Sequence, residues 1–149
     1  MYHLKKEQWI DVPKDQVWDF FSRPENLLKI TPSDMNMKIE DIPEGAMYPG
    51  MILRYKVSPL MGIPLSWTSH ISAVKEGDYF VDDMLEGPFK VWHHQHRFES
   101  KDGGTLIIDD LHYRIPLEPL SKIFHPILVQ RNLEKMFQHR ESVVKELFN

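Results

Sequence analysis

Hydrophobic and polar residues alternate along much of the chain between the N-terminus and residue 115, which is the pattern of β-strands with one covered face. Turns rich in Gly, Pro and Asp separate the alternating segments. The strands that this pattern predicts are 2–11, 37–42, 51–58, 65–75, 79–85, 89–100 and 105–115. Because the later connections are short, we expect successive strands to run antiparallel.

Three segments have helical spacing instead. Residues 14–22 follow Pro13 and carry a buried side, and residues 24–30 predict a second short helix. Residues 118–149 predict a long amphipathic helix at the end of the chain, with a break or a kink near Pro126. The positions on its inward-facing stripe are Ile127, Leu133, Met136, Phe137, Arg140, Val144 and Leu147.

This order of elements predicts an α+β fold, in which a curved antiparallel sheet of about six to seven strands wraps around the long C-terminal helix. The 149 residues fit a single domain, 1–149, that is large enough to bury a sizeable core. The space between the concave face of the sheet and the helix is either filled by side chains or kept as a pocket, and composition does not decide between the two.

Charge and composition exclude several classes of partner. The 18 Lys and Arg residues are scattered among 22 Asp and Glu residues, so we expect no binding to nucleic acid. With no cysteine, neither a disulfide framework nor a thiolate site is expected. No apolar run approaches the roughly 18 residues of a membrane span, so we expect no stable membrane insertion. The N-terminus lacks the apolar core of a signal peptide, which predicts a cytoplasmic location.

Candidate chemistry concentrates on the strand 89–100. Alternation places Trp92, His94, His96 and Phe98 on one face, which is expected to be covered. A buried polar group without a partner costs about 1–3 kcal/mol, so the two imidazoles require a hydrogen-bonding network, a ligand, a metal ion or water.

The next strand offers partners for these histidines. Asp109, Leu111 and Tyr113 share its more apolar face, so they meet His94 and His96 if both strands turn these faces inward. In a catalytic interpretation one histidine acts as general acid or base, Asp109 orients it, and Tyr113 polarises a ligand carbonyl. In the structural alternative the His and Asp side chains satisfy one another, and in a third interpretation they position a ligand without chemistry.

A metal site is the remaining alternative for this cluster. Two histidines spaced as His94 and His96 on a strand can both ligate an ion, and Asp109 could be a third ligand. With eight histidines in the chain such clustering arises easily by chance. We therefore expect no metal and no cofactor.

Large aromatic rings suggest the walls of an apolar pocket. Arg140 interrupts the apolar stripe of the last helix, so it is expected to reach a carboxylate of the sheet or the polar group of a ligand. The candidate ligand-binding residues are Trp67, Trp92, Phe98, Tyr55, Leu111, Phe137 and Arg140.

The apolar, proline-bounded segment 58–65 lies between two predicted strands. It is more hydrophobic than an exposed loop favours, so it either covers the mouth of a pocket or contacts a second copy of the chain in a homodimer. Docking to a membrane surface fits less well, because no basic cluster accompanies the segment.

These motifs together resemble the SRPBCC or START-like superfamily, and within it the small bacterial polyketide cyclase/dehydrase-like proteins. The resemblance covers nearly the whole chain. The matching residues are Gln8 to Ile10, Pro13, Val17 to Phe21, Pro24 to Leu27, Thr31, Pro32, Gly87 to Phe89, Trp92 to Phe98, Gly104, Thr105, Asp109, Tyr113 and Pro116.

The resemblance implies the helix-grip fold with a cavity for apolar molecules. We therefore expect the chain to bind a small hydrophobic or amphipathic molecule between the sheet and the C-terminal helix. The superfamily includes both binding proteins and enzymes, so membership alone does not imply catalysis. The alternatives are a cyclase/dehydratase- or isomerase-like enzyme that uses the His/Asp/Tyr set, and an interaction or regulatory module without a ligand.

Overall fold

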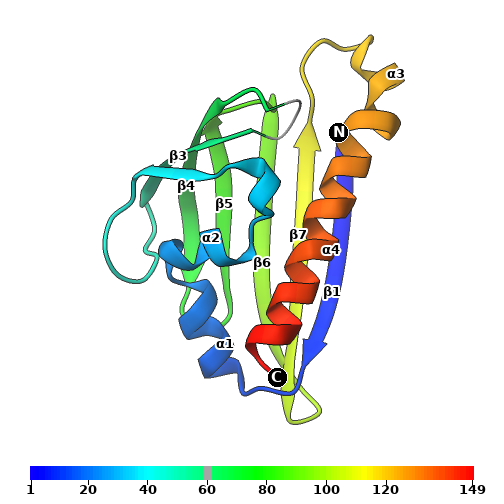
Figure 1. The fold of residues 1–149 in the computed structure, drawn as a ribbon. Coiled ribbons are helices and arrows are strands. Elements are labelled where there is room, and N and C mark those ends of the chain that lie inside the picture. The colour runs from blue at the N-terminus through cyan, green and yellow to red at the C-terminus, as the bar shows by residue number, and fades with distance from the viewer. Residues whose placement is uncertain (59–61) are drawn as a thin grey trace.

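The computed structural model describes residues 1–58 and 62–149. Within these ranges the strands form one seven-stranded antiparallel sheet in the order β1-β7-β6-β5-β4-β3-β2 (Figure 1). The strands are β1 (Tyr2–Ile10), β2 (Lys38–Asp41), β3 (Ile52–Val57), β4 (Leu65–Lys75), β5 (Tyr79–Glu86), β6 (Val91–Lys101) and β7 (Gly104–Arg114). The seven strands predicted from the alternation are all confirmed, and their ends differ from the prediction by two residues at most.

The first strand pairs with the last, which places the N-terminal strand beside the segment that leads into the C-terminal helix. In β1 burial alternates residue by residue, with His3, Lys5 and Glu7 exposed and Ile10 buried. The sheet therefore has one covered face and one face toward solvent, as a period-two pattern requires.

The two longest helices cover the same face of the sheet. Two short helices follow β1, and α1 (Lys14–Phe21) packs against β6 and β7. Figure 1 shows the long helix α4 (Gln130–Leu147) running along β7 and β1. The remaining short helices are η1 (Pro24–Asn26), α2 (Leu27–Ile30), η2 (Ser33–Met35), α3 (Ser121–Phe124) and η3 (His125–Val129).

The C-terminal region is interrupted near Pro126, where the prediction for 118–149 placed a break or a kink. It consists of α3, one π-helical turn η3 that contains Pro126, and α4. Proline lacks an N–H group and so interrupts the helical hydrogen-bond ladder. The change of register turns Ile127 outward, where it is 63% exposed, and Leu147 at the end of α4 is 47% exposed. Both were predicted to face inward, and that part of the prediction was wrong.

No helix in the described ranges is long and apolar enough to cross a membrane. The segment 58–65, predicted to be a lid or a dimer contact, lies partly outside the described residues, because 59–61 are not described.

Candidate functional site

A cavity of about 910 Å³ lies between the covered face of the sheet and the helices. Its walls are largely aromatic, and Trp67 and Trp92 meet edge to face with ring centroids 5.0 Å apart. Tyr55 stacks on Trp67 from the neighbouring strand, and Phe89 packs against Trp92. Offset and edge-to-face rings form flat apolar surfaces that suit a flat or elongated apolar molecule.

An apolar rim borders this cavity at the segment before α4. The rim residues Leu117, Leu120, Phe124 and Leu128 line the cavity and are between 44% and 78% exposed. An exposed cluster of large apolar side chains is unusual on the surface of a monomeric protein and typically marks a binding site. The rim therefore joins the interior apolar surface to the outside of the molecule.

A polar network adjoins the aromatic wall on the same strand as Trp92. In register, β6 places His96 directly opposite Asp109 of β7, and α4 brings Arg140 to the same point. His94 Nε2 donates to Asp109 Oδ1 over 2.8 Å, and the same oxygen lies 3.2 Å from both His96 Nδ1 and Arg140 Nη2. One carboxylate oxygen thus holds side chains from three elements together.

Burial and charge determine the ionisation of this network. Burial alone would raise the pKa of Asp109, but the Arg140 guanidinium and the hydrogen bonds from both imidazoles outweigh it, so the pKa lies well below its usual range. Burial, assisted by the positive field of His94 and Arg140, lowers the pKa of His96 to about 3. At neutral pH the network therefore contains an ionised Asp109, a charged Arg140 and a neutral His96.

His96 Nδ1 lies between a donor and an acceptor. Arg140 Nη2 is 3.3 Å away and can only donate, whereas Asp109 Oδ1 is 3.2 Å away and can only accept. With its proton on Nδ1 the ring donates to Asp109, and with its proton on Nε2 the ring accepts from Arg140. The His96 ring also stacks on Phe80, with centroids 4.3 Å apart.

The inner cluster His94, His96 and Asp109 is close enough in geometry to hold a metal ion. However, Arg140 already contacts the only carboxylate of the cluster at 3.2 Å. A guanidinium at this distance opposes a divalent cation through direct charge repulsion. The arrangement is that of a buried ion-pair network.

Three polar atoms of cavity-lining residues have no hydrogen-bond partner among the described residues: Trp92 Nε1, Asp82 Oδ1 and Ser121 Oγ. Burial raises the pKa of Asp82, while a hydrogen bond from Ser69 and the field of His94 oppose that rise. A buried donor or acceptor without a partner costs free energy, so these atoms favour a ligand or water that satisfies them.

Sequence reasoning did not single out Asp82. The available signal was the alternation of 79–86, which places Phe80, Asp82 and Met84 on one covered face. A carboxylate between two large apolar residues on such a face indicates either a buried pair or a ligand contact.

The residues predicted to bind ligand fall into two groups. Tyr55, Trp67, Trp92 and Arg140 line the cavity, as do His94 and His96. Phe98, Leu111 and Phe137 are buried but are not among the cavity-lining residues. Phe98 packs against rings of α1 instead, and Leu111 is fully buried beside His94, its partner in register on β7.

Tyr113 does not lie on the cavity wall either. Its hydroxyl lies 2.6 Å from His125 Nε2 of η3, and its ring stacks on Tyr2. Burial, together with the nearby Tyr2, raises the pKa of Tyr113 to about 12. The sequence did not show this pairing because the π-helical turn that carries His125 was predicted as ordinary helix. In this geometry Tyr113 fastens η3 to the sheet.

An antiparallel sheet that encloses an apolar cavity with a long C-terminal helix defines the helix-grip class of proteins. More particularly, residues 10–137 match the model of the family described as "Polyketide cyclase / dehydrase and lipid transport". The chain belongs to this family.

Solved structures give the same fold. A protein of Thermus thermophilus, TTHA0849, is 16% identical, with a TM-score of 0.68 over 99% of this chain and 100% of its own. Ara h 8.0201 is 17% identical, with a TM-score of 0.70 over 99% of this chain and 97% of its own. Major latex-like protein 151 from Panax ginseng is 15% identical, with a TM-score of 0.71 over 99% and 97%. A search of curated proteins found no sequence match.

Proposed function

We propose that the chain binds a small amphipathic molecule in the cavity between the sheet and α4. The observation that carries this proposal is the cavity itself, with a volume of about 910 Å³ and aromatic walls. Pockets for small organic ligands commonly have volumes of roughly 300–1,000 Å³. Such a volume argues against the alternative of an interaction module with a packed interior.

The polar atoms on the wall support a ligand with a hydrogen-bonding group. Trp92 Nε1 can only donate, so it favours a carbonyl, hydroxyl or acid oxygen of the ligand. Asp82 Oδ1 and Ser121 Oγ also belong to cavity-lining residues and have no partner among the described residues, and Arg140 lines the cavity as well. A molecule with an apolar body and one oxygen-bearing end matches this distribution.

The apolar rim of Leu117, Leu120, Phe124 and Leu128 supports a route into the cavity. These side chains are exposed on one side and line the cavity on the other. A ligand with an apolar body can therefore move from the rim to the interior without crossing a polar surface. This arrangement suits the uptake and release of molecules that are poorly soluble in water.

The experiment is a fluorescence titration with anilinonaphthalene sulfonate (ANS), a flat apolar anion whose emission rises in apolar surroundings. Leu53 lines the cavity and is 2% exposed, so Leu53→Trp adds an indole to the interior. The matched control is Leu85→Trp on β5, since Leu85 is 62% exposed and does not line the cavity.

The proposal predicts saturable binding of about one ANS per chain to the wild type and to Leu85→Trp, and affinity at least about tenfold lower in Leu53→Trp. Circular dichroism verifies that each variant is folded. Equal ANS affinity in Leu53→Trp and wild type would place the dye on the exposed rim and overturn the proposal. Absence of saturable binding to the wild type would overturn it as well.

An acid–base reaction of the cyclase/dehydratase or isomerase type is a second candidate. It is supported by one observation, that two imidazoles oriented by a shared carboxylate line the cavity. Two observations weigh against it: the pKa of about 3 makes His96 a weak base, and Tyr113 is bonded to His125 away from the cavity. If chemistry occurs, His96→Gln abolishes turnover and retains ligand binding; equal loss of both indicates a positioning role.

A further inference from the structure

Four of the eight histidines lie in one row across the outer face of the sheet, away from the cavity. In register, His3 of β1 lies opposite His112 of β7, and His112 lies opposite His93 of β6. The row continues through Asp83 of β5 to His70 of β4. Directly opposed side chains on neighbouring strands are close enough to act on one bound group.

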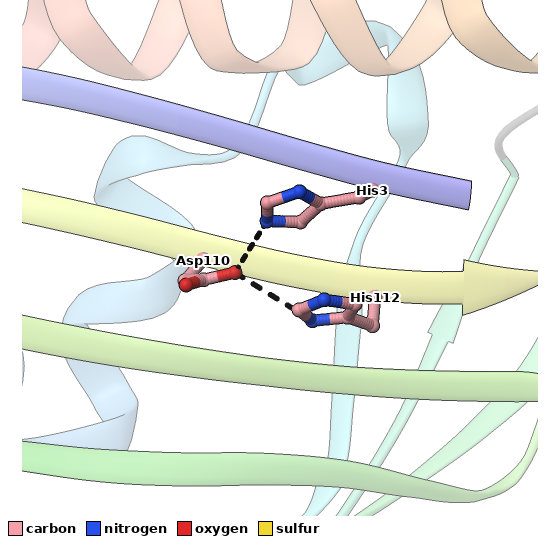
Figure 2. A group of neighbouring side chains, drawn as sticks. All are labelled: His3, Asp110 and His112. Carbon is pink, nitrogen blue, oxygen red and sulfur yellow. Dashed lines mark hydrogen bonds and ion pairs between the residues drawn. The ribbon is translucent and has the colours of Figure 1, made fainter. Parts of the chain in front are cut away.

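One end of this row forms a compact cluster of His3, Asp110 and His112. Figure 2 shows the carboxylate of Asp110 reaching toward both imidazole rings. Asp110 Oδ1 lies 2.7 Å from His3 Nε2 and 3.5 Å from His112 Nδ1. The two rings stack with centroids 4.3 Å apart, and one ligand atom from each of the three residues lies within 4.8 Å of the others.

These separations match those between ligands of a tetrahedral zinc ion. With bonds of about 2 Å, two ligands of such an ion are about 3.3 Å apart. A small opening of the His3–Asp110 contact would bring it to that distance, and both rings are at a strand surface where they can turn. All three side chains are between 35% and 50% exposed, so an ion can reach them from solvent and keep water as a fourth ligand.

Local charge also distinguishes this cluster from the inner one. In the inner cluster Arg140 occupies the carboxylate, whereas Asp110 has, among the described residues, only imidazoles within ion-pair distance. Lys5 lies opposite Asp110 in register, but its ammonium group is paired with Glu7 at 3.0 Å. The outer carboxylate can therefore exchange its imidazole contact for a cation.

We propose that His3, Asp110 and His112 form a binding site for a divalent transition metal ion, with Zn²⁺ the best match. Two imidazoles and one carboxylate suit Zn²⁺, Ni²⁺ or Cu²⁺ and do not suit Mg²⁺ or Ca²⁺, which prefer oxygen ligands. On binding, His3 Nε2 carries the ion in place of a proton, and the remaining proton of the neutral ring lies on Nδ1. His93 is the nearest additional imidazole along the row. The site is independent of the cavity and of any ligand bound there.

The test is calorimetric titration of the chelator-treated full chain with ZnCl₂, supported by Co²⁺ absorption spectra that report a tetrahedral site. The proposal predicts about one Zn²⁺ per chain, affinity lowered at least about tenfold by His3→Gln or His112→Gln, and no binding in the double variant. His139→Gln, which removes an exposed histidine from α4, is the control and retains the affinity. All these positions are at the surface, and thermal melts verify folding.

Absence of Zn²⁺ binding to the wild type at micromolar concentrations would overturn the proposal. Binding of one Zn²⁺ with unchanged affinity in the His3→Gln, His112→Gln double variant would also overturn it, because the ion would then lie elsewhere, such as at the inner cluster. Competition of excess Mg²⁺ with Zn²⁺ would contradict the assigned ligand chemistry.

Discussion

At the scale of single residues, Arg140 decides the character of the inner wall. Without it, His94, His96 and Asp109 would form an open cluster suited to a cation, whereas the guanidinium at 3.2 Å turns the carboxylate into one half of a buried ion pair. The same charge helps to keep His96 neutral. The network is therefore better suited to position a polar group than to bind a metal or to transfer protons at neutral pH.

Removal of one partner from the Asp109–Arg140 ion pair is expected to destabilise the folded chain. Asp109→Asn leaves Arg140, whose side chain is only 11% exposed, without a counter-charge, and should lower the free energy of unfolding by about 3–5 kcal/mol. The double change to Asp109→Asn with Arg140→Met should recover much of that loss. Urea unfolding measures both. Asp41→Asn, at an exposed pair on β2, is the control and should change stability by less than about 0.5 kcal/mol.

His96 should make stability depend on pH. Its pKa is about 3 in the folded chain against 6.5 when unperturbed, so between these values the unfolded state binds a proton that the folded state does not. Stability should therefore fall as pH drops below about 6.5, with a contribution of at most ~1.4 kcal/mol per pH unit from this group. Urea unfolding at pH 7 and pH 5 measures how much the free energy of unfolding falls between the two pH values. This fall should be about 1–2 kcal/mol smaller in His96→Gln than in wild type. His139→Gln should behave as wild type; an identical pH dependence in His96→Gln would show that His96 is protonated in the folded chain.

Alternation placed Trp92, His94 and His96 on the covered face, because the period of a strand fixes which side chains point inward. It gave no information on which inward-facing groups would pair. The pairing of Tyr113 with His125, and the lack of a partner for Asp82 Oδ1 among the described residues, depend on contacts between segments far apart in the chain. Such contacts follow from the register of the sheet and the position of η3, which a local pattern does not contain.

At the scale of elements, strands were easier to predict than the C-terminal helix. The predicted strand 65–75 coincides with β4, since turn residues bound it on both sides. The predicted helix 118–149 is interrupted near Pro126, as predicted, but a π-helical turn makes the interruption, and the predicted stripe was correct only from Leu133 to Val144. One extra residue in a helical turn rotates all preceding side chains about the helix axis. The predicted stripe therefore holds only within the regular helix α4.

Leucines at the two ends of the correctly predicted helix α4 should contribute differently to the free energy of unfolding. Leu133 is 7% exposed and Leu147 is 47% exposed on the same helix. Leu133→Ala should lower the free energy of unfolding by about 2 kcal/mol or more, whereas Leu147→Ala should cost less than about 1 kcal/mol. Chemical denaturation of the two variants provides the comparison. Similar losses would mean that the C-terminal end of α4 is packed as tightly as its first turn.

At the scale of the whole molecule, the fold class could be predicted from the sequence, but the open interior could not. The same large rings either fill a core or line a cavity, and the difference depends on how far α4 lies from the sheet. In the structure the rings of Tyr55, Trp67 and Trp92 pack on one another along the wall and leave about 910 Å³ beside them. The proposed binding function depends on this volume.

The most direct test is to locate a bound molecule. Crystals of the chain grown with ANS should show the dye between the sheet and α4, with an oxygen or nitrogen of the dye within hydrogen-bond distance of Trp92 Nε1. Dye bound only on the outer side of the rim residues, with the interior filled by side chains, would contradict the account.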